Sequence, residues 1–274
     1  MSPIWSSRST TRRADRPVAH VHPTAVVDPG AKLADDVELG PYSVVGDGVE
    51  LASGVQLSSH VILVGCTSVG ARTRIFPFSV IGEEPQVQGV EGETSLHIGE
   101  DNIIREYASI HAGSPIGVGC TRIGNNNFIL NNVHIAHDCQ VGSNCVIASF
   151  SAMAGHVEVH DHAVLGAMVG IHQFCRIGES SFSGARCKLT RDVAPYSKVM
   201  GDRPRFAGVN SVGMRRRGFS LEKVAELKHA FHLLFQSKLR LAPAMEQVGR
   251  ECGDSPEVRR LLDFLTTSKR GVTR

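Results

Sequence analysis

An aliphatic residue recurs at every sixth position over most of the sequence. The series runs without a slip from Val27 to Ile81, resumes from Ile98 to Ile110, and continues from Ile123 to Ile177. Ser183 breaks the series before Leu189 restores it. An amphipathic helix would instead place apolar residues at i, i+3, i+4 and i+7. The period therefore excludes helices from this part of the chain.

A period of six predicts short strands separated by tight turns, in which each strand sends one aliphatic and one small side chain inward. Three such strands form one triangular coil of about 18 residues. Stacked coils pair strand on strand, and the inward aliphatic residues form continuous columns. We predict a mainly β fold, a left-handed parallel β-helix of hexapeptide repeats over residues 19–204.

Two segments interrupt the period. Residues 83–96 and 114–121 are rich in glycine, proline and polar residues, so we expect them to loop out of the coil. Loops on a rigid scaffold are where binding groups usually lie.

The character of the chain changes at about residue 205, where we expect a small α-helical domain over residues 205–274. Residues 220–236 carry an amphipathic stripe with Ser220 as the N-cap. Two further helices are expected over 243–251 and 255–267, after Pro243 and Pro256. Residues 1–18 are rich in Ser, Thr and Arg without an apolar period and are expected to form a disordered extension; a transit peptide is the alternative.

Charge and cysteine content limit the classes of function. The chain of 274 residues has 29 Lys and Arg against 27 Asp and Glu, so no overall field would recruit nucleic acid or a membrane surface. Its apolar runs are too short to span a membrane, so a soluble protein is expected. Four of the seven cysteines fall in the inward small-residue position, which favours buried thiols and a reducing cytoplasm: Cys139, Cys145, Cys175 and Cys187.

A cluster of histidines is the strongest candidate for chemistry. His134, His137 and Asp138 lie within one short segment. Steps of about 18 residues from this segment should bring further polar residues above it on successive coils, roughly 4.8 Å apart. The expected column along one edge of the prism contains His137, Gly155, His156, His172 and Gln173.

Such a column has the groups that acyl transfer to a hydroxyl requires. An imidazole can accept the hydroxyl proton, and an adjacent carboxylate can fix its tautomer, which suits His137 and Asp138. The backbone N–H of Gly155 can stabilise the oxyanion. Two alternatives remain open. The residues could be ordinary polar groups on the corners of the coil, or His134 and His137 could bind a metal, although residues three apart on a β-coil point in different directions.

A basic cluster follows the last repeat. Its arginines surround Asn210 in sequence and could bind a pyrophosphate or an acidic partner that carries phosphopantetheine: Arg203, Arg205, Arg215, Arg216 and Arg217. The alternative is a solvated basic face that precedes a helix.

Several motifs together resemble one family closely, the acyl-ACP–UDP-N-acetylglucosamine O-acyltransferases that begin lipid A synthesis. The resemblance extends from about Val21 to the C-terminus through VHPTAVV, NNVHIAHDCQVG, AGHV, VGIHQFCRIG and RRRGFS. It implies a homotrimer of parallel rods with active sites between neighbouring subunits. It also implies transfer of an acyl or 3-hydroxyacyl group from acyl carrier protein to a UDP-amino sugar, with no metal or bound cofactor.

The resemblance also implies roles for individual residues. His137 matches the family's general base, Asp138 its orienting acid and Gly155 its oxyanion donor. The positions that match substrate contacts are His134, His156, His172 and Gln173, together with Asn210, Arg216 and Arg217 for the nucleotide and its phosphates. Phe182 and Ala185 match the positions that set acyl-chain length.

Three positions depart from the family pattern. Val87 and Gly89 stand in the first loop where an Asp and a Lys are usual, and Val212 stands where an acid is common. Missing polar contacts change substrate selectivity. A paralogue that acylates a different nucleotide sugar, such as a 3-amino sugar nucleotide, is therefore an alternative. A non-catalytic trimeric β-helix is a further alternative from another class.

Overall fold

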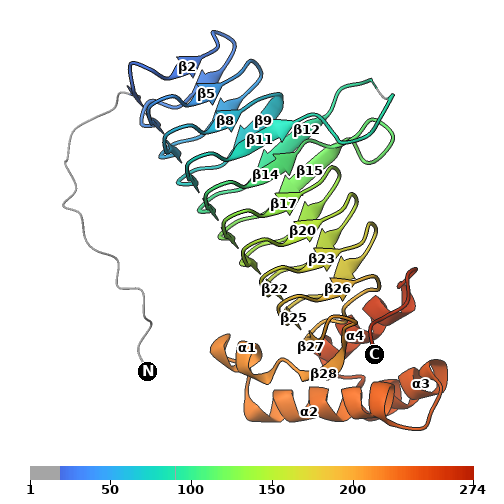
Figure 1. Ribbon diagram of the computed structural model, residues 1–274. Coiled ribbons are helices and arrows are strands. Elements are labelled where there is room, and N and C mark those ends of the chain that lie inside the picture. The colour runs from blue at the N-terminus through green and yellow to red at the C-terminus, as the bar shows by residue number, and fades with distance from the viewer. Residues whose placement is uncertain (1–18, 90) are drawn as a thin grey trace.

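The computed structural model describes residues 19–89 and 91–274; the expected N-terminal extension lies outside these residues. The described chain forms a stack of triangular coils closed at its C-terminal end by helices (Figure 1). Its three faces are parallel sheets, which we name A, B and C. The predicted left-handed β-helix is confirmed.

Sheet A ends in the only antiparallel pair among the described strands, β27 with β28. Its strands are β1 (His20–Val21), β4 (Glu38–Leu39), β7 (Gln56–Leu57), β10 (Arg74–Ile75), β13 (Ile103–Ile104), β16 (Phe128–Ile129), β19 (Val146–Ile147), β22 (Val164–Leu165), β25 (Phe182–Ser183), β27 (Ser197–Met200) and β28 (Arg205–Val209).

Sheets B and C form the other two faces. The strands of sheet B are β2 (Val26–Val27), β5 (Val44–Val45), β8 (Ile62–Leu63), β11 (Val80–Glu83), β14 (Ser109–His111), β17 (His134–Ile135), β20 (Ala152–Met153), β23 (Gly170–Ile171) and β26 (Lys188–Leu189). The strands of sheet C are β3 (Lys32–Leu33), β6 (Glu50–Leu51), β9 (Cys66–Val69), β12 (Ser95–Ile98), β15 (Cys120–Ile123), β18 (Gln140–Val141), β21 (Glu158–Val159) and β24 (Arg176–Ile177).

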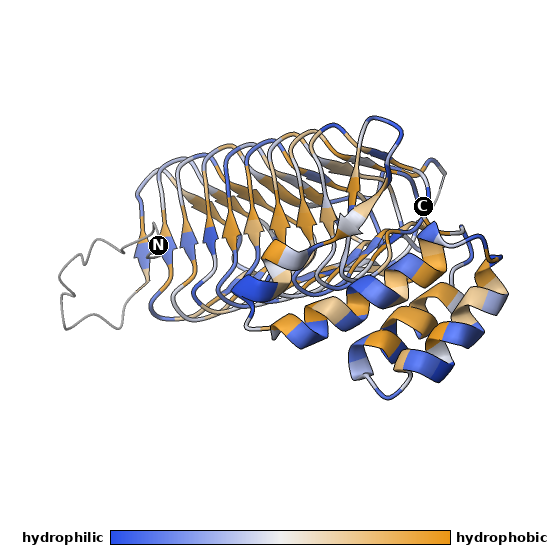
Figure 2. Ribbon diagram, turned by 90° about the horizontal axis from the view of Figure 1, so that it is seen from below, coloured by the Kyte–Doolittle hydropathy of each residue, from blue (hydrophilic) through white to orange (hydrophobic). Residues whose placement is uncertain are grey.

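The register of the strands confirms the predicted coil length. His134 pairs with Ala152, and Ala152 pairs with Gly170, so each step is 18 residues. In the two-residue strands from β4 to β26, the second residue is buried, and all of these residues except Ser183 are apolar and form the core. Figure 2 shows the hydrophobic strands in orange along the stack. The four thiols expected to point inward are buried, and burial raises the pKa of Cys139 and Cys145 to about 12.

From Tyr42 onward, most corners of the triangle are tight turns with one residue in the left-handed region. At the corner between sheets B and C, this position is held by Asp138, His156 and Phe174, with φ of 62°, 62° and 63°. Asp and Asn tolerate this conformation better than most residues do, whereas bulky side chains adopt it only where the surroundings enforce it. The stacked backbone therefore places these three side chains one above another.

The two expected loops leave the coil at neighbouring levels, after β11 and after β14 (Figure 1). They are joined at their base, where the Ser95 N–H donates to the Gly119 carbonyl at 3.0 Å and the Gly113 N–H donates to the Ser95 carbonyl at 3.0 Å. The loops therefore support each other beside sheets B and C.

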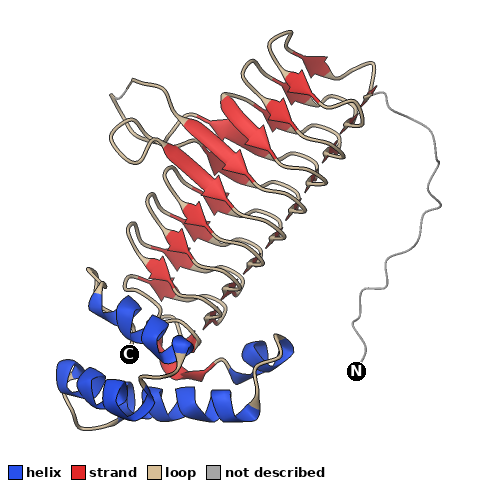
Figure 3. Cartoon of the chain, turned by 180° about the vertical axis from the view of Figure 1, so that it is seen from behind, coloured by secondary structure: helices blue, strands red, loops and turns tan. Residues whose placement is uncertain are grey.

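Helices cover the C-terminal end of the coil (Figure 3). They are α1 (Ser211–Arg216), α2 (Leu221–Phe231), a π-helical turn η1 (His232–Gln236), α3 (Leu241–Cys252) and α4 (Pro256–Thr266). Ser220 caps α2 as predicted, since its side chain accepts from the Lys223 N–H. The helices share a second core that includes Leu227, Phe231 and Leu261.

Three features of this region differ from the expectation. Residues 205–209 form β28 rather than the start of a helical domain, and α1 was not predicted. The prediction that a helix begins at Pro243 is wrong, because α3 begins at Leu241 and Pro243 lies in its first turn. A first-turn residue has no intrahelical acceptor for its N–H, so proline is tolerated there. Within the described residues, no helix is long and apolar enough to cross a membrane.

Candidate active site

The candidate site is a pocket of about 520 Å³ on the outer face of sheet B. The outward residues of β17, β20, β23 and β26 are His134, Ala152, Gly170 and Lys188 in register. Because alanine and glycine occupy two consecutive levels, the face is hollow between the histidine and the lysine. Other residues that line the pocket are Gln86, His137, Gly155, His172 and Thr190.

His137 and Asp138 form a hydrogen-bonded pair at the edge of this pocket. The distance from His137 Nδ1 to Asp138 Oδ2 is 2.8 Å, and the side-chain exposures are 14% and 0%. An ionised carboxylate only accepts, so Nδ1 carries the proton and donates it to Asp138. In the neutral imidazole, Nε2 is then the nitrogen without a proton, and it is the one that can accept a proton from a substrate.

The second loop holds the other oxygen of Asp138. The N–H groups of Ser114 and Gly119 donate to Oδ1 at 3.1 and 3.0 Å, and the backbone N–H of Asp138 donates to the Thr121 hydroxyl at 2.8 Å. Burial raises the pKa of Asp138, but the hydrogen bonds from His137 and Ser114 outweigh it and hold the pKa below its ordinary value. The carboxylate is therefore charged and fixed in orientation.

His156 lies one coil above Asp138, and its Nδ1 is 3.8 Å from Asp138 Oδ2. Its ring meets the His137 ring edge-on at 5.1 Å and stacks on Phe174 at 4.5 Å. Burial lowers the pKa of His156 and outweighs the opposing effect of Asp138. His156 therefore packs against the pair as a neutral imidazole at neutral pH.

Gly155 leaves space that the His137 ring fills. A Cβ on this residue would lie 2.5 Å from His137 Cε1 and 2.7 Å from His137 Nε2, so any side chain would displace the imidazole. The N–H of Gly155 has no acceptor among residues 19–89 and 91–274, although its carbonyl accepts from the Phe174 N–H. Gly155 thus contacts the His137 ring and carries an unpaired N–H, which can donate to an oxyanion.

Gly155→Ala is expected to reduce kcat for the expected acyl transfer by about a hundredfold. The added methyl group would shift the His137 ring, and a shift of one ångström in a catalytic group has an effect of that order. Steady-state kinetics and sedimentation of the purified variant check this result. Gly249→Ala in α3 is the matched control, since its Cβ would meet only Leu262 at 4.0 Å. Equal kcat for the two variants would contradict the close fit of His137 against Gly155.

Two other predicted histidines line the same pocket. His134 Nδ1 lies 2.8 Å from the Ser109 hydroxyl, and burial together with His111 lowers the pKa of His134. His172 is exposed and lies two coils above His134. It lines the same pocket as Gly155. Gln173 is exposed and is not among the lining residues.

Sequence reasoning did not assign Gln86, Ser114 and Gly119 to this site. Gln86 reaches the pocket from the first loop, and its place in a loop beside the repeat was a signal for it. The role of Ser114 and Gly119 had no signal, because backbone N–H groups can be supplied by any non-proline residue.

The residues matched to the nucleotide lie at the far end of the coil. Asn210 is buried and caps α1: Oδ1 accepts from the Gly213 N–H at 3.2 Å, and Nδ2 donates to the Ser180 carbonyl at 2.8 Å. Arg216 and Arg217 are both exposed, and Arg217 contacts the Ser180 hydroxyl and pairs with Glu179 at 3.3 Å. Within one chain, these residues do not line the His137 pocket.

The two positions matched to acyl-chain length lie on another part of the surface. Phe182 is an outward, half-buried residue of β25 in sheet A, and Ala185 is exposed in the turn that follows. Neither lines the His137 pocket of the same chain.

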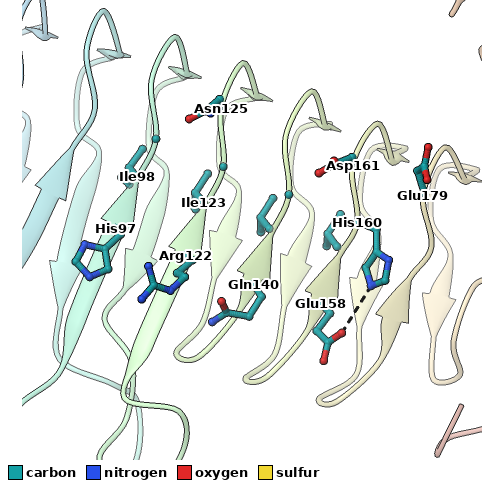
Figure 4. A pocket seen from close by; sticks show the side chains of 15 residues that line it. His97, Ile98, Arg122, Ile123, Asn125, Gln140, Glu158, His160, Asp161 and Glu179 are labelled. Carbon is teal, nitrogen blue, oxygen red and sulfur yellow. Dashed lines mark ion pairs between the residues drawn. The ribbon is translucent and has the colours of Figure 1, made fainter. Parts of the chain in front are cut away.

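A larger groove of about 780 Å³ lies on sheet C, on a different face from His137. Figure 4 shows that His97, Arg122, Gln140 and Glu158 project from successive coils along it, with an ion pair between Glu158 and His160. The predicted site residues are absent from its lining.

The structure does not support the metal-binding alternative for His134 and His137, because they are not brought together. Over the described ranges, one group of possible ligands lies within 4.8 Å, namely His137, Asp138 and His156. The hydrogen bond from His137 to Asp138 already gives this group a function in orienting the imidazole.

These features define a class of protein. A left-handed hexapeptide β-helix with a carboxylate-oriented imidazole beside a free backbone N–H has the parts of an acyltransferase. The model of the bacterial transferase hexapeptide repeat matches residues 120–155, and the model of UDP N-acetylglucosamine O-acyltransferase, domain 2, matches residues 192–273.

Whole-chain similarity identifies the family. An acyl-[acyl-carrier-protein]–UDP-N-acetylglucosamine O-acyltransferase from Thiobacillus denitrificans is 44% identical over 94% of this chain and its own full length. LpxA from Acinetobacter baumannii is 40% identical, with a TM-score of 0.90, over 93% of this chain and 99% of that chain. The UDP-N-acetylglucosamine acyltransferase of Francisella novicida is 35% identical, with a TM-score of 0.90, over 93% and 94% of the two chains. This chain belongs to the acyl-ACP–UDP-N-acetylglucosamine O-acyltransferase family.

Proposed function

We propose that this enzyme transfers a 3-hydroxyacyl or fatty acyl group from acyl carrier protein to a hydroxyl of UDP-N-acetylglucosamine, the first step of lipid A synthesis. The observation that carries the proposal is the hydrogen bond of 2.8 Å that fixes His137 Nδ1 on Asp138 and leaves Nε2 free, with Gly155 packed against the imidazole ring. Family membership supports the two substrates.

The mechanism needs only groups of this site. His137 Nε2 accepts the hydroxyl proton while the hydroxyl oxygen attacks the thioester carbonyl carbon. The Gly155 N–H donates to the resulting oxyanion. The carbon–sulfur bond then breaks, and protonated His137 returns its proton to the leaving thiolate. Each bond and proton in these steps is accounted for by His137, Gly155 and the two substrates, so the proposal includes no metal or bound cofactor.

We also infer that the chain works as a homotrimer. The outward residues at five successive levels of sheet A are apolar and half-buried: Ile103, Phe128, Val146, Val164 and Phe182. At the adjoining corner with sheet B, exposed rings stack at 4.9 to 5.2 Å: Tyr42, His60, Phe78 and Tyr107. Large exposed apolar patches mark association sites. A trimer would bury sheet A and bring Phe182 and Ala185 of one copy beside the pocket of another.

Val146→Glu is expected to convert the trimer into a monomer, because it places one charge per copy in this apolar face. Analytical ultracentrifugation of the purified variant measures the change in mass. Arg122→Glu on the polar face of sheet C is the control and should remain trimeric. A trimeric Val146→Glu variant, or a monomeric wild type, would show that sheet A is not the interface.

A cytoplasmic location fits the chemistry of the cysteines. All seven are free thiols, and five of them are buried, which suits a reducing compartment. Acyl carrier protein would be the protein partner, and the near-equal charges give no reason to expect nucleic acid.

The first loop lacks charged residues that are usual in the family, so a second acceptor should be tested. Val87 lines a separate pocket and Gly89 has a φ of +71°, so neither supplies the charged groups usual in the family. Exposed Val212 in α1 likewise lacks the acid that is common there. A 3-amino sugar nucleotide is therefore the alternative acceptor. The intact His137–Asp138 pair argues against a non-catalytic scaffold.

One assay tests the proposal and separates the acceptors. The purified protein is incubated with a panel of acyl-ACPs and with either UDP-N-acetylglucosamine or its 3-amino analogue, and the nucleotide product is measured by mass spectrometry. We expect one acyl group on UDP-N-acetylglucosamine. Turnover of the 3-amino analogue alone would support the paralogue, and no turnover with any nucleotide sugar would reject the enzyme function.

A further inference from the structure

The N-terminal end of the coil, where β2 lies in Figure 1, leaves the apolar core open. Among the described strands, β1, β2 and β3 each pair on one side only. Their second residues are incompletely covered, since Val21 is 40% exposed and Val27 and Leu33 are half-buried. One coil further on, the corresponding Leu39 and Val45 are each 1% exposed. The first coil therefore presents both apolar side chains and strand edges to its surroundings.

An end of this kind favours a covering segment. Stacked repeats usually need a terminal cap, and a strand edge readily pairs with a further length of extended chain. Val26, on the outer face of the same coil, is 62% exposed and enlarges the apolar surface. The end of the coil thus fits a segment that brings a large apolar side chain and lies along the strand edges.

The rim of this end is acidic. Residues 19–50 contain six acids, one lysine and no arginine. All six acids are exposed: Asp28, Asp35, Asp36, Glu38, Asp47 and Glu50. Lys32 pairs with Glu50 at 2.7 Å, and the other five acids have no cationic partner within residues 19–89 and 91–274. Such a rim attracts a basic segment and repels a second copy of the same end.

We propose that residues 1–18 of the same chain bind over this end and cap the coil. Their charge complements the rim, because they carry one acid, Asp15, and four arginines: Arg8, Arg12, Arg13 and Arg16. They also contain a bulky apolar pair, Ile4 and Trp5, which suits the uncovered core. The inference is independent of the proposed acyl transfer.

The connection is long enough for this contact. From Trp5 to Ala19, the first residue of the described coil, an extended chain of about 14 residues spans up to about 46 Å. One face of the coil takes about six residues, which is about 20 Å at most. Trp5 can therefore reach any part of the open end while the arginines pass along its rim.

The end of the coil supplies what residues 1–18 lack by themselves. Taken alone, they show no apolar period and are expected to be disordered. A segment of low hydrophobicity can become ordered when a partner provides the apolar surface. The proposed order therefore depends on contact with the first coil.

Fluorescence of Trp5 tests the proposal on the full chain, because Trp5 is the only tryptophan. In the wild type, its emission should lie at a shorter wavelength than in the denatured protein, and acrylamide should quench it less. The double variant Asp35→Lys/Glu38→Lys reverses two exposed acids of the rim. In this variant, emission and quenching should approach those of the denatured protein, while circular dichroism shows that the coil is folded.

The matched control is Glu246→Lys/Asp254→Lys. It makes the same change of net charge on exposed acids at the opposite end of the molecule. The emission of Trp5 in this control should equal that of the wild type. Added salt should shift the wild-type emission to longer wavelength, because it screens charges at the exposed rim.

Hydrogen exchange supplies the second readout. The backbone amides of Val21, Val27 and Leu33 should exchange about tenfold more slowly in the wild type than in Trp5→Ser, since a cap protects the edge strands from local opening. Amides of the inner coils, such as that of Ile135, should exchange equally in the two proteins.

Three results would overturn the proposal. The first is a Trp5 emission in the wild type equal to that of the denatured protein. The second is a shifted emission that the reversed rim charges leave unchanged, which would place Trp5 elsewhere. The third is protection of the first coil that appears only with rising protein concentration and a doubled mass in sedimentation, which would assign the end to a second copy.

Discussion

His137→Ala is expected to lower kcat for acyl transfer by about a thousandfold, with the trimer intact. A positioned general base contributes between about a hundredfold and ten-thousandfold. The alanine variant retains the Gly155 N–H and the pocket on sheet B, so substrate binding should change little. Steady-state kinetics with acyl-ACP and UDP-N-acetylglucosamine, together with sedimentation of the variant, measure both expectations.

His232→Ala is the matched control, because His232 is an exposed histidine of η1 outside the pocket. Its kcat should equal that of the wild type. If His137→Ala turned over at the wild-type rate, another group would have to be the base, and the assignment of His137 would fall.

Asp138→Asn is expected to reduce kcat by a similar factor, about a thousandfold, for a different reason. The N–H groups of Ser114 and Gly119 both donate to Oδ1, so the amide oxygen of asparagine must take that place. The amide NH₂ then faces His137 Nδ1, which must become an acceptor. The proton moves to His137 Nε2, and the base is lost, as in other triads with this change.

The fold should tolerate this substitution, since asparagine readily adopts the left-handed conformation found at position 138. Asp161→Asn is the control, because Asp161 also accepts a backbone N–H, from Ser143 at 2.8 Å, but lies on another corner of the coil. Equal rates for the two variants would mean that the orientation of Asp138 does not control the proton on His137.

The coil and its register could be predicted because they follow from one local rule. Each strand needs one inward aliphatic residue, so the period of six fixes which residues lie above one another. The same rule places His137, Gly155 and His156 together from the sequence alone, and the structure confirms their contact. It also predicted the buried thiols, such as Cys139.

The parts outside the repeat could not be predicted in this way. β28 pairs with β27 because the coil ends there and leaves an open strand edge, which is a tertiary effect. A proline such as Pro243 predicts a helix boundary, but proline is compatible with the whole first turn, and α3 begins at Leu241. The contacts by which the Asn210 side chain caps α1 and bonds to Ser180 likewise have no signal in the repeat.

The orientation of the catalytic pair depends on contacts that have no sequence signature. Ser114 and Gly119 act through backbone N–H groups from a loop of irregular sequence. The composition of this loop indicated that it leaves the coil, but not that it returns to hold Asp138. A motif can thus identify the acid and the base, while the tautomer follows only from the folded loop.

Neutron diffraction from crystals of the deuterated protein at pH 7.5 locates the protons on His137 directly. The mechanism requires deuterium on Nδ1, directed at Asp138, and none on Nε2, which faces the pocket. Deuterium on Nε2 with a bare Nδ1 would contradict it, because the imidazole could then not accept the proton of an attacking hydroxyl.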